Sequence, residues 1–357
     1  MRPNQSVGLL MLTCCCLAVA AWYAPRPGYP AARQVPVVVE RFDPAANDIV
    51  PEAPTLQRLA TGYTWTEGPV WTHDGYLLFA EIPSNTIREV VPGRPATVFL
   101  HPSGYLGSAP FHGREPGSNG MTLDALGRLT VAGHGQRDVY RVESLGDPAA
   151  AHTILADRYQ GKRLNSPNDL VYRSDGSLYF TDPPYGLPTQ SDTDAGKELR
   201  VNGVYRLPAA VDQEPGAPPR RDALQLLVGD LPRPNGIAFS PDEQYLYVDN
   251  SGARKIWMRY PVKPDGTLGA GTVFYDASAE PRPGNPDGMK VDRTGNVYSA
   301  GPGGVWIFSP AGKHVATILV PEVVSNVNWG GLDGKSLFIT ATTSVYQIDL
   351  KVPGVRP

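Results

Sequence analysis

One unit, repeated six times, constrains the fold of this chain more than any other feature. Its clearest copy is SPNDLVYRSDGSLYFTDPPYG at 166–186, which has a polar start, an alternating apolar run, a turn with Asp and Gly, and a second apolar run. Alternation with period two on both sides of a tight polar turn predicts a β-hairpin. The other copies begin at Glu67, Ser118, Pro234, Pro286 and, more faintly, Ser325.

These hairpins predict an all-β fold, a six-bladed β-propeller with a central metal site. In a propeller each blade is a four-stranded sheet of about 40–50 residues, and the blades pack around an axis. Further strand-like runs follow each core hairpin, and no sustained helical period is found between 55 and 350. We therefore expect one propeller domain at 55–350, with a strand at 55–60 completing the sixth blade.

The N-terminal segment has the pattern of a targeting sequence. Arg2 precedes an apolar stretch at 7–20 that ends in small residues, which is typical of a secretory signal cleaved near Ala20 or Ala21. We expect a signal peptide at 1–21, a Pro-rich linker at 22–54, and export to the periplasm or the extracellular space. An uncleaved anchor is the alternative, although the stretch is short for a membrane span. After cleavage no stable membrane insertion is expected.

Composition excludes several classes of function. The net charge of -3 leaves no basic excess for phosphate backbones, so nucleic acid is not an expected partner. All three cysteines, Cys14 to Cys16, lie inside the predicted signal. The mature chain would therefore have no thiol, which excludes disulfides, zinc–thiolate sites and cysteine nucleophiles.

A carboxylate or amide residue leads every repeat at the same position. These residues are Glu67, Asn119, Asn168, Asn235, Asp287 and, less surely, Asn326 or Asn328. Because the inner strands of a propeller line its axis, we expect these side chains to meet at one end of the central tunnel. Two carboxylates with several amide oxygens suit a hard divalent cation. Water or substrate would complete the coordination, as metal-assisted hydrolysis requires.

Other interpretations of the same residues remain open. Asn or Asp before Gly is also an ordinary turn pair that bonds its own backbone. The chain has no HExxH spacing and no GxSxG elbow, so a zincin or a serine hydrolase is not indicated. His134 is the one histidine placed to face the mouth of the tunnel, because it follows the second core hairpin. The insertions at 101–118 and 187–202 are long enough to cover that mouth.

Six strings within the repeats are specific enough to compare with known families. They are EGPVW from 67, EPGSNGMTLD up to 124, NSPNDL with TDPPYG up to 186, PNGIAFSPDEQYLYV from 234, and NPDGMKVDRTGNVY from 285. In this order they resemble the gluconolactonase and regucalcin (senescence marker protein) family, in particular its gluconolactonase-like bacterial members. The resemblance covers about 60–350 and implies a six-bladed propeller that uses one divalent ion, usually calcium, to hydrolyse sugar lactones.

The resemblance also implies roles for single residues. The metal ligands of the family fall on Glu67, Asn168, Asn235 and Asp287. Its substrate-contacting positions fall on Asn119 and around His134 and Arg163. Bacterial members often carry Glu just before the histidine, where this chain has Gly133, so one substrate-orienting carboxylate is expected to be absent.

The first hypothesis is therefore an exported lactonase that opens an aldono-1,5- or 1,4-lactone, such as gluconolactone, with water activated by the metal. Calcium is the expected ion, with Mg²⁺, Mn²⁺ and Zn²⁺ as alternatives. Of the two ring carboxylates, Asp287 is the shorter, and we expect its free oxygen to act as general base. Two alternatives stay open: a related esterase or organophosphate hydrolase, and a non-catalytic calcium-binding propeller. A lactone panel with and without chelator discriminates between them.

Overall fold

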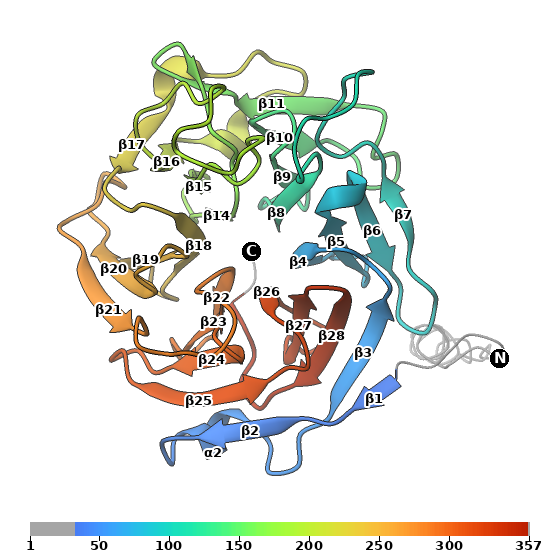
Figure 1. The fold of residues 1–357 in the computed structure, drawn as a ribbon, viewed down its shortest axis with the longest axis vertical. Coiled ribbons are helices and arrows are strands. Elements are labelled where there is room, and N and C mark those ends of the chain that lie inside the picture. The colour runs from blue at the N-terminus through green and yellow to red at the C-terminus, as the bar shows by residue number, and fades with distance from the viewer. Residues whose placement is uncertain (1–32, 356–357) are drawn as a thin grey trace, which may run out of the picture.

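The computed structural model describes residues 33–355, which form six antiparallel sheets arranged as blades around a central axis (Figure 1). The first core strand of each blade is innermost, and the six inner strands contact one another around the axis. The predicted six-bladed β-propeller is confirmed.

Blades I to IV have four strands each, which follow one another from the axis outward. Blade I contains β4 (Thr66–Trp71), β5 (Leu77–Glu81), β6 (Thr86–Val90) and β7 (Thr97–Leu100). Blade II contains β8 (Ser118–Leu123), β9 (Leu129–Gly133), β10 (Asp138–Val142) and β11 (His152–Ala156). Blade III contains β14 (Leu170–Tyr172), β15 (Leu178–Asp182), β16 (Gly203–Leu207) and β17 (Gln225–Val228). Blade IV contains β18 (Pro234–Phe239), β19 (Tyr245–Asn250), β20 (Ile256–Pro261) and β21 (Thr272–Asp276).

Blades V and VI gain strands from the N-terminal side of the chain. Blade V contains β22 (Met289–Val291), β23 (Val297–Gly301), β24 (Gly304–Phe308), β25 (His314–Leu319) and β2 (Val38–Arg41). Blade VI contains β26 (Val324–Gly330), β27 (Ser336–Ala341), β28 (Ser344–Asp349), β3 (Leu56–Thr61) and β1 (Arg33–Val35). The remaining elements are the ribbon β12 (Arg158–Tyr159) and β13 (Lys162–Arg163), and the short helices α2 (Ala46–Ile49), η1 (Ile82–Ser84), η2 (Ala210–Asp212) and η3 (Arg221–Ala223).

The ring closes within blade VI, where strands from the two ends of the propeller pair. β3 lies antiparallel to β28, with Leu56 opposite Ile348 and Thr61 opposite Ser344. The expectation that a strand at 55–60 completes the sixth blade is therefore confirmed. Figure 1 shows β3 beside β28, next to blade I, so one sheet joins early and late parts of the chain.

The described part of the segment predicted as a linker is attached to the propeller by two strands. β2 pairs with β25 at the outer edge of blade V, and β1 pairs with β3. The alternating valines of this stretch, Val35, Val37 and Val39, pack against the core of these two blades, which explains why it is extended and attached. The predicted signal peptide lies outside the described residues. No helix within 33–355 is long and apolar enough to cross a membrane.

His314 is a histidine built into the outer layer of blade V. Its ring stacks on Trp306 with the centroids 3.9 Å apart and the planes 3° from parallel. Its Nε2 lies 2.9 Å from Thr317 Oγ1 and 3.0 Å from Ala316 O. Partial burial lowers the pKa of His314 to about 4, so the stacked ring is neutral at pH 7.

Acidification is therefore expected to cost stability at His314. The pKa of His314 in the folded protein lies below its value of about 6.5 in the unfolded chain. The neutral ring therefore contributes fully to the free energy of unfolding above about pH 6.5, and this contribution is lost as the pH falls toward 4. After allowance for solvent screening the loss is about 1–2 kcal/mol. Denaturant unfolding at pH 7.5 and 4.5 tests this, with His314→Phe as a stacking variant that cannot titrate. Equal losses in parent and variant would contradict the assignment.

Candidate functional site

The residues that lead the repeats sit where the inner strands begin. Glu67, Asn119 and Asn235 lie in β4, β8 and β18, and the pairing register of each strand shifts there. Such a bulge takes a residue out of the regular ladder and re-aims its side chain. Asn168 and Asp287 occupy the equivalent place just before β14 and β22. All five therefore lie at the same end of the tunnel.

One cavity of about 290 Å³ opens among these five residues. Its lining includes Glu67, Asn119, Asn168, Asn235 and Asp287, together with Trp65, Glu115, Tyr185 and Gln190. The first four of these ring residues are buried, whereas Asp287 is partly exposed to the cavity. Convergence of residues from five blades is the arrangement that the repeat alignment predicts.

The glycines that follow the ring residues serve packing between blades. A Cβ on Gly68 would lie 2.1 Å from Asn119 O, and one on Gly236 would lie 2.3 Å from Asp287 O. Real Cβ atoms do not approach a carbonyl so closely, so at these two places one inner strand can touch the next only because glycine is present. In blade III Asp169 follows the ring residue Asn168 instead. Since Asn119 and Asn235 lie within strands, the turn-pair interpretation does not hold for these two Asn-Gly pairs. Asp287 lies before β22, and its Oδ1 accepts a hydrogen bond from Gly288 N–H, as that interpretation expects.

Negative charge is crowded at this end of the tunnel. Burial, reinforced by the charge of Asp169, raises the pKa of Glu67 to about 8. Burial and the charges of Glu67 and Asp249 raise the pKa of Asp287 well above its usual range. A bound cation would relieve this repulsion, which is the electrostatic environment that a metal site needs.

Unpartnered oxygens add to this fit. Asn119 Oδ1 and Asp249 Oδ2 are buried and have no hydrogen-bond partner among the described residues, whereas Asp169 Oδ2 lies 3.8 Å from Lys290 Nζ in an ion pair. Buried polar atoms without a partner are costly, so Asn119 Oδ1, whose residue lines the cavity, is placed to bind a ligand. Within 33–355 no three His, Cys, Asp or Glu side chains are grouped to hold a metal. A cation here would therefore need the amide oxygens as well as the two carboxylates.

Glu115 is a site residue that the sequence interpretation missed. Its Oε2 lies 2.7 Å from His134 Nδ1, and its Oε1 accepts a 2.8 Å hydrogen bond from Gln190 Nε2. His134 Nε2 in turn lies 3.3 Å from Asn119 Nδ2. Glu115 belongs to the first predicted insertion and Gln190 to the second. Only the general expectation that these loops cover the mouth could have indicated them.

The predicted substrate residues are placed unequally. Asn119 lines the cavity, and His134 supports it from behind with a fully buried ring. Arg163 lies in β13, where its Nη2 donates to Gln136 O at 2.8 Å, and it does not line the cavity described above. We therefore leave Arg163 out of the proposed site.

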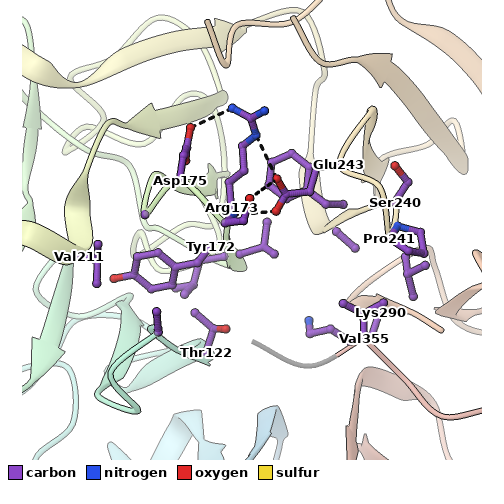
Figure 2. Close-up of a pocket in the computed structure, with 18 of the residues that line it drawn as sticks. Thr122, Tyr172, Arg173, Asp175, Val211, Ser240, Pro241, Glu243, Lys290 and Val355 are labelled. Carbon is purple, nitrogen blue, oxygen red and sulfur yellow. Dashed lines mark hydrogen bonds and ion pairs between the residues drawn. The ribbon is translucent and has the colours of Figure 1, made fainter. Parts of the chain in front are cut away.

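A second cavity, of about 440 Å³, lies at the opposite ends of the inner strands. Thr122, Tyr172 and Lys290 line it, and Arg173 reaches between Asp175 and Glu243 (Figure 2). These charges pair with one another, with Arg173 2.9 Å from Asp175 and 3.4 Å from Glu243. Of the two possible sixth leading residues, Asn328 lines this second cavity, whereas Asn326 donates a 3.2 Å hydrogen bond to Glu67 Oε2. Because the second cavity is lined mainly by apolar residues and contains none of the five residues that converge on the smaller one, the smaller cavity is the candidate active site.

Comparisons with known proteins agree with this geometry. Residues 65–343 match the model of the "SMP-30/Gluconolactonase/LRE-like region". The chain is 36% identical to a gluconolactonase of Zymomonas mobilis over 326 residues, 88% of this chain and 87% of that protein. It superposes on a gluconolactonase of Xanthomonas campestris with a TM-score of 0.74 and 32% identity, covering 90% of this chain and 99% of that one. A calcium-binding regucalcin of Agrobacterium tumefaciens shares the fold, with a TM-score of 0.60 and 18% identity, over 83% of this chain and 94% of that one.

Proposed function

Because this chain belongs to the SMP-30/gluconolactonase/LRE-like family and is a lactone hydrolase, we propose that it opens a sugar lactone with the help of one divalent cation. The preferred substrates are aldono-1,5- or 1,4-lactones such as gluconolactone. The observation that carries the proposal is the convergence of five oxygen-bearing side chains on one cavity. That cavity, about 290 Å³, is near the lower size limit of small-molecule sites, which suits a single sugar ring.

The cation would be held by Glu67, Asn168, Asn235 and Asp287. Two carboxylates and two amide oxygens favour calcium, and such a set leaves places for water and substrate. When bound, the ion would polarise the lactone carbonyl and make a water more acidic. Support for this donor set comes from the two carboxylates with raised pKa, Glu67 and Asp287, which line one cavity together with the two amides.

Asp287 is the proposed general base. Its Oδ1 accepts a 3.1 Å hydrogen bond from Gly288 N–H, which leaves Oδ2 for the cavity. In the reaction Asp287 takes a proton as water oxygen bonds to the carbonyl carbon. The ring C–O bond then breaks, and the same proton passes to the departing ring oxygen, so the product is a hydroxy acid. Asn119 binds a substrate hydroxyl and takes no part in proton transfer.

A lactone panel with and without chelator tests the function. We expect glucono-1,5-lactone to be hydrolysed by the calcium-loaded protein, activity to be lost in EGTA, and calcium to restore it. Hydrolysis of esters or phosphotriesters in place of lactones would favour the related hydrolases. Tight calcium binding with no turnover of any substrate would favour a non-catalytic propeller.

We also propose that the mature protein is exported to the periplasm or the extracellular space. The apolar stretch at 7–20 with its small C-terminal residues supports this. Mass determination of the N-terminus in exported fractions is the direct check.

A further inference from the structure

Three side chains form a chain of contacts that ends at the cavity. Glu115 Oε2 lies 2.7 Å from His134 Nδ1, and His134 Nε2 lies 3.3 Å from Asn119 Nδ2. The imidazole is fully buried and the carboxylate is partly exposed. Glu115 is itself held by Gln190 through its other oxygen.

The donors and acceptors in the contacts Glu115–His134–Asn119 fix the position of the proton on His134. An amide nitrogen can only donate, so His134 Nε2 must be the bare nitrogen that accepts from Asn119. The single proton of the neutral ring is then on Nδ1 and is donated to Glu115, since a carboxylate only accepts. The hydrogen bond from Asn119 Nδ2 to His134 Nε2 thereby fixes the orientation of the amide. Its Oδ1, which is buried and unpartnered among the described residues, is left for a ligand.

We propose that Glu115 is a positioning residue that acts through His134 to present Asn119 Oδ1 to the substrate. An oxygen in this position accepts a hydrogen bond, so the site selects lactones with a ring hydroxyl that can donate to it. This specificity rests on the proposed lactonase function, whereas the side-chain arrangement stands independently of it. If the amide were reversed, its NH₂ group would face the hydroxyl and the acceptor would be lost.

The surroundings of His134 explain why the carboxylate comes from a loop. A Cβ on the preceding residue, Gly133, would lie 2.5 Å from Asp138 Oδ1, so a longer side chain there would have to displace Asp138. On another side, a Cβ on Gly186 would lie 2.6 Å from His134 Cβ. The ring is therefore tightly enclosed, and Glu115 supplies the acceptor that Gly133 cannot.

Turnover of two lactones with the same ring tests the proposal. Glucono-1,5-lactone carries ring hydroxyls and δ-valerolactone carries none. In Glu115→Ala we expect kcat/KM for gluconolactone to fall about tenfold or more, the effect of one lost hydrogen bond, mainly through KM. For valerolactone it should change less than about threefold, and calcium affinity should be kept. The matched control is Glu198→Ala, because Glu198 is a loop carboxylate that bonds Arg163 N–H and touches neither His134 nor Asn119.

A ¹⁵N spectrum of histidine-labelled protein provides a readout that does not depend on turnover. The parent is expected to show His134 with its proton on Nδ1, and Glu115→Ala to show a mixture of tautomers. If Glu115→Ala does not fold, Glu115→Gln replaces it, because an amide no longer forces the proton onto Nδ1.

Two outcomes would overturn the proposal: a parent His134 protonated on Nε2, or an equal loss of activity on both lactones in the folded variant. If the parent hydrolyses neither lactone, the proposed function fails, and the spectrum alone then decides whether Glu115 sets the tautomer.

Discussion

Asp287→Asn is expected to lower kcat by about 10²–10⁴-fold, the range typical of a lost general base. Asparagine keeps an oxygen that can bind a cation and still accept the Gly288 N–H bond, but it cannot take up a proton at the position of Oδ2. Removal of one negative charge beside Glu67 and Asp249 also relieves repulsion, so the variant should fold at least as well as the parent. The variant is therefore expected to lose turnover and to keep its fold.

The measurement requires the variant to be loaded with calcium, shown by metal analysis before kinetics. Asn119→Ala is the comparison, because it removes a substrate hydrogen bond and should act mainly on KM. If calcium-loaded Asp287→Asn turned over gluconolactone within tenfold of the parent, Asp287 would be only a ligand. The base would then have to be another group, or bulk water.

The ring of polar residues could be predicted because equivalent positions of successive repeats lie close together around the axis of a propeller. Equivalent positions in successive repeats must lie at the same height along the axis, so alignment of the hairpins was sufficient to bring Glu67, Asn119 and Asp287 to one cavity. The same logic predicted the closing strand, since one blade lacked its outermost member. Both predictions depended on the repeat itself and on no individual contact.

Glu115 could not be found in this way, because it belongs to no repeat. Its contact with His134 depends on how an irregular loop returns over the mouth, and its contact with Gln190 depends on a second loop. Two-residue periodicity carries no information about such segments. The position of Arg163 could not be predicted from the repeat either, because it lies in the small ribbon β12–β13 outside the blades.

The role of the glycines was also hidden in the sequence. Asn-Gly and Asp-Gly pairs are usual in turns, and nothing local distinguishes a turn glycine from one that lets two strands approach. Only the neighbouring blade shows the difference, because the backbone oxygen that excludes a side chain at Gly236 belongs to Asp287 of blade V. The two blades concerned are IV and V.

Gly236→Ala is expected to damage both stability and catalysis through this contact. The added methyl would lie 2.3 Å from Asp287 O and 2.8 Å from Asp249 Oδ2, so the start of blade V must move by roughly 1 Å to reach an ordinary contact distance. Overpacking against backbone should cost about 3 kcal/mol, near the upper end of such substitutions. A displacement of this size at a catalytic residue should lower kcat/KM by about 100-fold.

Gly229→Ala is the matched control, because its Cβ would be no closer than 3.5 Å to Val201 and meets no backbone atom among its nearest contacts. Its free energy of unfolding should stay within about 0.5 kcal/mol of the parent. Denaturant unfolding, calcium titration and lactonase kinetics of both variants show whether Gly236 only packs the blades or also positions Asp287. A loss of stability with unchanged calcium affinity and unchanged kcat/KM would mean that Gly236 only packs the blades. Loss of all three together would mean that this glycine sets the position of Asp287, so that the distance between two blades fixes the geometry of the ring.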